Sequence, residues 1–126
     1  MKKILIGLVL ALCLAGCAKI EEALSTTVSP QAALVAANSF DALEAVATGY
    51  LQLPTCGKTT VVTCKTTAAM NAILPLVRSG RVARDQIEAL LKANSGAAIP
   101  LTNYNTLQAV ITSLQGIYAQ YNVKTS

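Results

Sequence analysis

Two pairs of acidic residues are the strongest candidates for catalytic side chains in this 126-residue sequence. Asp41 and Glu44 lie three residues apart, and Asp85 and Glu88 repeat that spacing. Carboxylates that face each other across a cleft can hydrolyse a glycosidic bond. The same spacing is typical of the solvated face of an ordinary helix. We favour the helix-face interpretation and do not expect an enzyme.

The sequence lacks the other residues on which catalytic and cofactor sites usually depend. It contains no histidine, the commonest general base and the commonest metal ligand. Gly57-Lys58-Thr59 follows a cysteine, without the earlier glycine that a phosphate-binding loop requires. We therefore expect no metal, no cofactor and no small-molecule substrate.

Three arginines, Arg78, Arg81 and Arg84, form the most concentrated group of charges. Such a group could bind anionic lipid headgroups, lipopolysaccharide phosphates or an acidic protein. Alternatively, opposite charges four residues apart on a helix could pair locally. The resulting pairs would be Arg81 with Asp85, Arg84 with Glu88, and Glu88 with Lys92. We favour this local pairing, which leaves Arg78 without a neighbour of opposite charge.

Three tyrosines, Tyr104, Tyr118 and Tyr121, lie near the C-terminal end among asparagine and glutamine residues. They could form a protein-binding surface, because tyrosine combines a large contact area with a polar tip. They could equally belong to the ends of a helical core, with their hydroxyls reaching water. We favour the core interpretation.

The first 17 residues have the order of a bacterial export signal. Met1-Lys2-Lys3 precedes an apolar run over residues 4–12, which is typical of a signal peptide. The run ends short of the roughly 20 apolar residues that a membrane span needs. Leu14-Ala15-Gly16-Cys17 matches the lipobox, so the N-terminus resembles that of bacterial lipoproteins.

The lipoprotein resemblance implies a processed and lipid-anchored protein. Residues 1–16, including Cys13, would be removed as a signal peptide, and the new N-terminal Cys17 would be acylated. Because Ala18 rather than aspartate follows Cys17, the resemblance also implies the outer membrane, with the protein facing the periplasm. Residues 17–28 would then form a lipidated tether that spans at most about 40 Å. Residues 29–126 would form the folded domain.

The charge and composition of the processed chain exclude two classes of protein. Loss of Lys2 and Lys3 would lower the formal net charge from +4 to +2. That excess is too small for charge-driven binding to nucleic acid. The low charge and the many alanine, leucine and valine residues also argue against disorder. The remaining length suits one compact domain.

Cys56 and Cys64 are expected to form a disulfide. Export places them in an oxidising compartment, where paired cysteines usually bond to each other. A metal site is a weaker alternative, because the chain has no histidine and no second cysteine pair. A redox-active pair is also weaker, because the spacing differs from Cys-x-x-Cys. The disulfide would close a short loop.

The first and last helices have clear boundaries in the sequence. Ser29-Pro30 has the form of an N-cap followed by a first-turn proline, and the helical period continues to Leu53. The last helix is expected to begin at Thr102 or Asn103 and to end near Tyr121.

The middle of the chain is expected to hold one or two helices. Residues 66–79 have helical period, but Pro75 should kink or split them. Ser79-Gly80 should then break or bend the chain before a further helix over residues 81–94. Three or four amphipathic helices with short connections predict an all-α fold. The specific expectation is a small antiparallel three- or four-helix bundle with one disulfide-closed loop.

Several short strings in the chain are similar to strings in small proteins of proteobacteria and their phages. They are Ser39-Phe40-Asp41-Ala42-Leu43-Glu44, Tyr50-Leu51, the loop from Cys56 to Cys64, and Val77-Arg78-Ser79-Gly80-Arg81. The similarity implies a Gram-negative bacterium or a prophage as the source, and it implies no activity.

Together these features predict a lipid-anchored envelope protein that faces the periplasm and acts by binding, in a structural or accessory role. Its expected partners are the membrane, through the N-terminal lipid, and an envelope protein. The alternative is an envelope effector encoded by a phage or prophage, active in superinfection exclusion or lysis.

Overall fold

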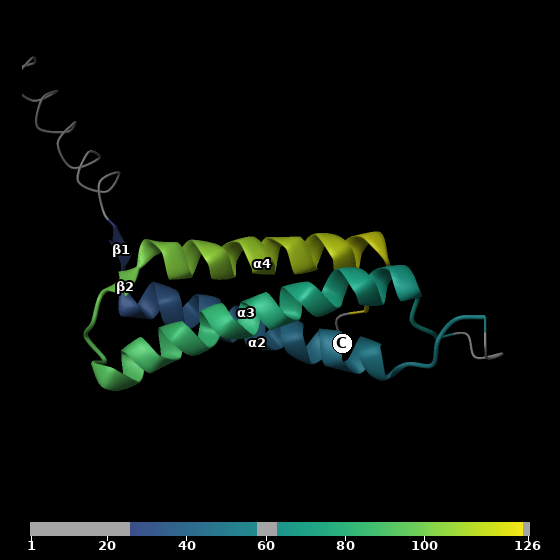
Figure 1. The fold of residues 1–126 in the computed structure, drawn as a ribbon, viewed down its shortest axis with the longest axis horizontal. Coiled ribbons are helices and arrows are strands. Elements are labelled where there is room, and N and C mark those ends of the chain that lie inside the picture. Colours follow the sequence, from purple (N-terminus) through teal and green to yellow (C-terminus); the bar gives the residue numbers. More distant parts are fainter. Residues whose placement is uncertain (1–25, 58–62, 125–126) are drawn as a thin grey trace, which may run out of the picture.

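Three helices make up most of the computed structural model, which describes residues 26–57 and 63–124. They are α2 (Pro30–Gln52), α3 (Thr67–Ala93) and α4 (Leu101–Gln120). Each helix packs against the other two, and α3 runs antiparallel to α2 and α4 (Figure 1). Two short strands, β1 (Thr27–Val28) and β2 (Ile99–Pro100), pair antiparallel. The expected mostly helical fold is confirmed, with a small sheet that the sequence did not predict.

The chain enters the described part of the fold at the end where α2 and α4 begin (Figure 1). The Leu101 N–H donates to the Thr26 carbonyl at 2.8 Å, next to the pairing of β1 with β2. We call this the tether end, and we call the opposite end, where α2 leads into α3, the disulfide end. The predicted signal peptide, Cys17 and residues 18–25 lie outside the described residues.

Helix α2 begins where local capping rules place it. The Ser29 Oγ accepts a hydrogen bond from the Ala32 N–H at 3.2 Å, and Pro30 occupies the first turn. This is the predicted N-cap arrangement, and it satisfies one of the free N–H groups at the helix start. The helix ends at Gln52, just before Leu53 and Pro54.

The middle of the chain differs from the prediction, because α3 is one continuous helix. The expected break at Ser79-Gly80 is wrong. Gly80 is buried, and a Cβ atom there would lie 2.0 Å from Cε2 of Phe40 on α2. The glycine therefore allows two helices to pack closely, and it does not end a helix.

Pro75 also lies inside α3 without splitting it. Proline cannot donate to the carbonyl four residues earlier, which belongs to Asn71. Both residues are exposed, so water can reach the carbonyl that proline leaves unbonded. Ile73 and Val77 flank the proline and are buried, which holds the helix against the core on both sides.

The core is a single cluster to which all three helices and β2 contribute. Its largest fully buried side chains are Phe40, Ile73, Ile87, Ile99, Leu107 and Leu114. Full burial of a side chain of this kind contributes about 1.5–3 kcal/mol. The buried positions recur every three or four residues along each helix, which is the amphipathic pattern that the sequence predicts.

Candidate functional site

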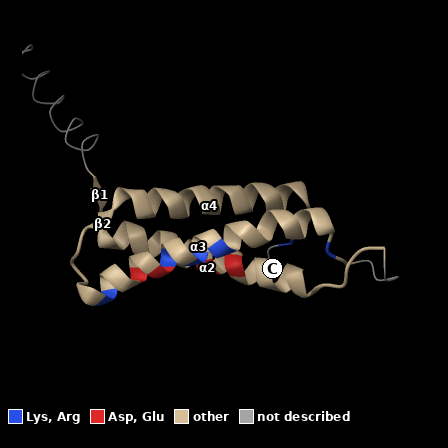
Figure 2. Cartoon of the chain, in the orientation of Figure 1, with Lys and Arg blue, Asp and Glu red and all other residues tan. Residues whose placement is uncertain are grey.

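The predicted arginine group and both carboxylate pairs meet in one ion-pair network between α2 and α3. Arg81 Nε lies 2.5 Å from Glu44 Oε1, and Arg84 Nη1 lies 2.5 Å from Asp41 Oδ1. Figure 2 shows the charges gathered along α2 and α3, whereas α4 carries none. The network therefore joins two neighbouring helices through residues that are 37 and 43 positions apart in sequence.

The favoured local pairing within α3 is partly wrong. Arg81 pairs with Glu44 of α2 and not with Asp85, whose carboxylate lies 2.8 Å from Arg84 Nε. The two other predicted pairs are present, Arg84 with Glu88 at 3.9 Å and Lys92 with Glu88 at 3.4 Å. The difference arises because α2 and α3 are antiparallel and place two acids opposite two arginines with the same three-residue spacing.

Arg84 is the centre of this network. Its side chain is 21% exposed and contacts carboxylates on both helices. Burial lowers the pKa of the Arg84 guanidinium, but the hydrogen bonds and charges of Asp85 and Asp41 outweigh that effect and raise the pKa above its ordinary value. The guanidinium carbon also lies 6.0 Å from the centroid of the Phe40 ring. Arg84 thus stays charged and holds the two helices together.

Every carboxylate of the network forms an ion pair. Asp41, Glu44, Asp85 and Glu88 each pair with an arginine or a lysine. The open depression beside Asp41 and Glu44, with a volume of about 600 Å³, is also lined by Arg84. No group of three potential metal-ligating side chains occurs within residues 26–57 and 63–124.

The same contacts treat the three arginines that could bind an anionic partner differently. Arg81 and Arg84 pair with carboxylates of α2. The network contains four acidic residues, and α3 contains four basic residues, Arg78, Arg81, Arg84 and Lys92. Arg78 is exposed and makes no hydrogen bond or ion pair with the described part of the chain. Arg78 is therefore the arginine of the three that no carboxylate of the described residues neutralises.

The three predicted tyrosines have different surroundings. Tyr118 is 4% exposed, and its hydroxyl donates to the Leu43 carbonyl at 2.7 Å. Burial raises the pKa of Tyr118 to about 12, and the charge of Glu44 adds to this effect. Tyr104 and Tyr121 are half-buried. A single surface formed by all three is therefore wrong, because Tyr118 belongs to the core and its hydroxyl bonds to backbone.

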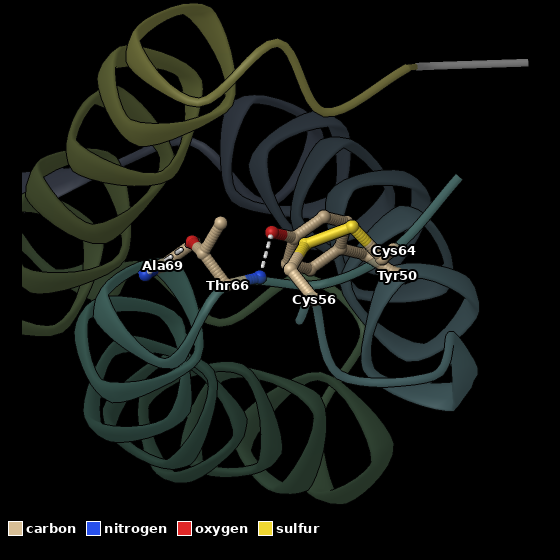
Figure 3. The surroundings of a disulfide bond; sticks show 5 residues. All are labelled: Tyr50, Cys56, Cys64, Thr66 and Ala69. Atoms are coloured by element: carbon tan, nitrogen blue, oxygen red, sulfur yellow. Dashed lines mark hydrogen bonds between the residues drawn. A yellow bond between two sulfur atoms is a disulfide. The ribbon is translucent and has the colours of Figure 1, made fainter. Parts of the chain in front are cut away.

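The disulfide between Cys56 and Cys64 is present, with the two Cα atoms 5.0 Å apart. It stands where α2 leads into α3, and further contacts fasten the same corner. The Tyr50 hydroxyl accepts a hydrogen bond from the Thr66 N–H at 2.9 Å (Figure 3). The Lys65 ammonium donates to the Leu51 carbonyl near the end of α2. The loop closure thus fixes the end of one helix against the start of the next.

An open groove of about 780 Å³ lies at the disulfide end. Its α2 wall consists of small and apolar residues, including Ala42, Ala45, Val46 and Gly49, and its other wall includes Cys64 and residues 121–124. Lys124 is the charged residue among those that line it. Such a lining can accept an apolar side chain of a partner but offers no acid–base pair.

Two features of the site were not predicted from the sequence. The first is the match between the Asp41/Glu44 spacing and the Arg81/Arg84 spacing, which could have indicated a contact between helices. The second is a pair of exposed aliphatic residues near the tether end, Leu34 at 49% and Val35 at 60%. Their adjacent positions break the expected polar face of α2.

None of the three described helices is long and apolar enough to cross a membrane. Comparisons with known proteins give no further assignment: no protein-family model, no curated protein and no solved structure matches the chain.

Proposed function

We propose that the chain is a bacterial lipoprotein that faces the periplasm and acts by binding, in a structural or accessory role in the cell envelope. The observation that carries this proposal is Leu14-Ala15-Gly16-Cys17 after a basic and then apolar N-terminus. Cleavage before Cys17 and acylation of that residue would anchor the folded domain. We further propose that α2, α3 and α4 form the complete helical bundle of this domain.

The disulfide supports an exported protein. Stable disulfides between structural cysteines are typical of the periplasm and are rare in the bacterial cytoplasm. Cys56 and Cys64 lie in a loop that joins two helices, which suits a structural staple in a small domain.

The distribution of charges supports binding over catalysis. The four acidic side chains of the described residues neutralise arginine and lysine side chains. A carboxyl group that acts as a general acid or base must lie within hydrogen-bond reach of the substrate. The groove at the disulfide end, with its small and apolar α2 wall, suits contact with another protein.

The anchor can be tested with two cysteine variants. We expect the unchanged protein and Cys13→Ser to fractionate with membranes and to carry the mass of the acyl groups, because Cys13 lies in the part that is removed. Cys17→Ser should lose both properties, since the acyl acceptor is gone. Membrane fractionation of Cys17→Ser with no mass difference from the unchanged protein would contradict lipidation.

The partner can be identified by crosslinking in intact cells followed by mass spectrometry. An envelope protein that crosslinks near the disulfide-end groove is the expected result. The second candidate is an effector encoded by a phage or prophage, and the resemblance of short strings to strings in phage proteins bears on the source of the chain, not on its activity. Lysis or tail genes beside the coding sequence would support that candidate.

A further inference from the structure

Two of the three exposed large aliphatic side chains of the described residues lie next to each other near the tether end. Leu34 is 49% exposed and Val35 is 60% exposed. They fall in the second turn of α2, about 6–8 Å along the helix from its first residue. Val82, which is 58% exposed, lies on α3 in a separate groove that Thr102 and Thr106 of α4 also line.

The surroundings of this aliphatic pair carry little charge. Residues 26–40 and the whole of α4 contain no charged side chain. Val35 shares a shallow groove with Gln31, Tyr104 and Gln108, and the Tyr104 hydroxyl accepts a hydrogen bond from Gln108. Lys92 lies in the last turn of α3, which ends at the same end of the fold, and it pairs with Glu88. An aliphatic pair beside an amphipathic tyrosine can enter a lipid interface without burying an unpaired charge.

The tether that leads from Cys17 to β1 indicates that a lipid bilayer covers this surface. Nine residues separate Cys17 from β1, and they can span at most about 35 Å. The disulfide end lies about 34 Å further along α2. A lipid on Cys17 therefore keeps Leu34 and Val35 close to the bilayer at a high effective concentration, which makes even a small apolar surface sufficient to orient the domain.

We infer that Leu34, Val35 and Tyr104 form a second membrane contact that seats the tether end in the lipid headgroup region. This inference rests on the proposed lipid anchor. It orients the molecule, because α2 then points away from the bilayer and carries the disulfide-end groove towards a partner in the periplasm.

The absence of tryptophan from the chain allows a direct test. Val35→Trp introduces one fluorophore at the proposed contact, and Leu34→Trp is a second probe at the same place. Gln52→Trp is the matched control, since Gln52 is exposed on the same helix about 25 Å away. Each lipidated full-length variant is incorporated into phosphatidylethanolamine and phosphatidylglycerol vesicles, with and without brominated acyl chains.

The expected result is a blue shift of the emission at positions 34 and 35 and a loss of its intensity on brominated lipid, with neither change at position 52. Equal quenching of all three probes by aqueous acrylamide, and none by brominated lipid, would overturn the inference. Shielding of positions 34 and 35 from both quenchers would also overturn it, because a second copy or another protein would then cover the surface.

Flotation with the vesicles separates the two proposals. Protein that floats with vesicles while position 35 stays in water refutes the membrane contact alone. Protein that carries no acyl group and does not float refutes the anchor, and the membrane contact fails with it.

Discussion

The ring of Phe40 occupies the space in which a side chain of residue 80 would begin. A Cβ atom at Gly80 would lie 2.0 Å from Cε2, 2.5 Å from Cζ and 2.8 Å from Cδ2 of that ring. This contact sets how closely α2 and α3 approach each other. The neighbouring pairs Arg81–Glu44 and Arg84–Asp41 then meet across the same two helices.

Gly80→Ala should therefore destabilise the protein. Overpacking of a core typically costs about 1–3 kcal/mol, and the better helix propensity of alanine returns up to about 1 kcal/mol. We expect the midpoint of urea unfolding to fall. Gly116→Ala is the matched control, since a Cβ there meets nothing within 4 Å, and it should raise the midpoint. A rise for both variants would show that Phe40 moves aside freely.

Features that depend on a few neighbouring residues could be predicted from the sequence. The cap at Ser29 and the proline after it fix the start of α2, and both act within one turn. Asn94 is the C-cap of α3, which agrees with the predicted end of a helix at residue 94. The spacing of Cys56 and Cys64, together with the expected export, was sufficient to predict their disulfide.

Features that depend on distant residues could not be predicted in the same way. Gly80 has the sequence pattern of a helix break, and only the position of Phe40, 40 residues earlier, shows that it is a packing site. Arg81 has a candidate partner four residues away, but Glu44 across the helix interface takes that role. The periodicity of α4 indicates that Tyr118 is in the core, yet it does not identify the Leu43 carbonyl as the partner of its hydroxyl.

Removal of the central arginine should weaken the contact between α2 and α3. Arg84→Met retains most of the aliphatic stem but loses the ion pairs with Asp41 and Asp85. We expect a loss of about 1–2 kcal/mol in the free energy of unfolding, because charge-assisted hydrogen bonds exceed ordinary surface pairs. Arg78→Met should stay within about 0.5 kcal/mol of the unchanged protein, since Arg78 is an exposed residue outside the network.

Salt provides an independent check on this explanation. Ions screen exposed charges, so the difference in stability between Arg84→Met and the unchanged protein should narrow as salt rises from about 0.1 M to about 1 M. A difference that is insensitive to salt would indicate lost packing on Phe40 instead of lost ion pairs.

Loss of the disulfide should lower stability without abolishing the fold. The Cys56–Cys64 bond closes a short loop, which in the loop-entropy model corresponds to about 2.5 kcal/mol. The hydrogen bond between Tyr50 and Thr66 remains after the bond is lost and still holds the corner. Cys56→Ser with Cys64→Ser should keep the helical circular dichroism at 25 °C but unfold at lower urea. Identical unfolding of the oxidised and serine proteins would contradict the role as a staple.

Tyr118 should make the protein sensitive to high pH. Its pKa in the folded state is about 12, whereas that of a tyrosine in the unfolded chain is about 10. The folded state therefore keeps the proton that the unfolded state has lost, so stability is intact below about pH 10 and declines as pH rises towards about 12. Tyr118→Phe removes this group, and its unfolding midpoint should change less over that interval than the midpoint of the unchanged protein. Absorbance at 295 nm, which rises when a tyrosine loses its proton, should show a phenolate that forms at high pH in the folded unchanged protein and is missing from the variant. Ionisation of every tyrosine near pH 10 without unfolding would contradict this prediction, because Tyr118 would then be open to water.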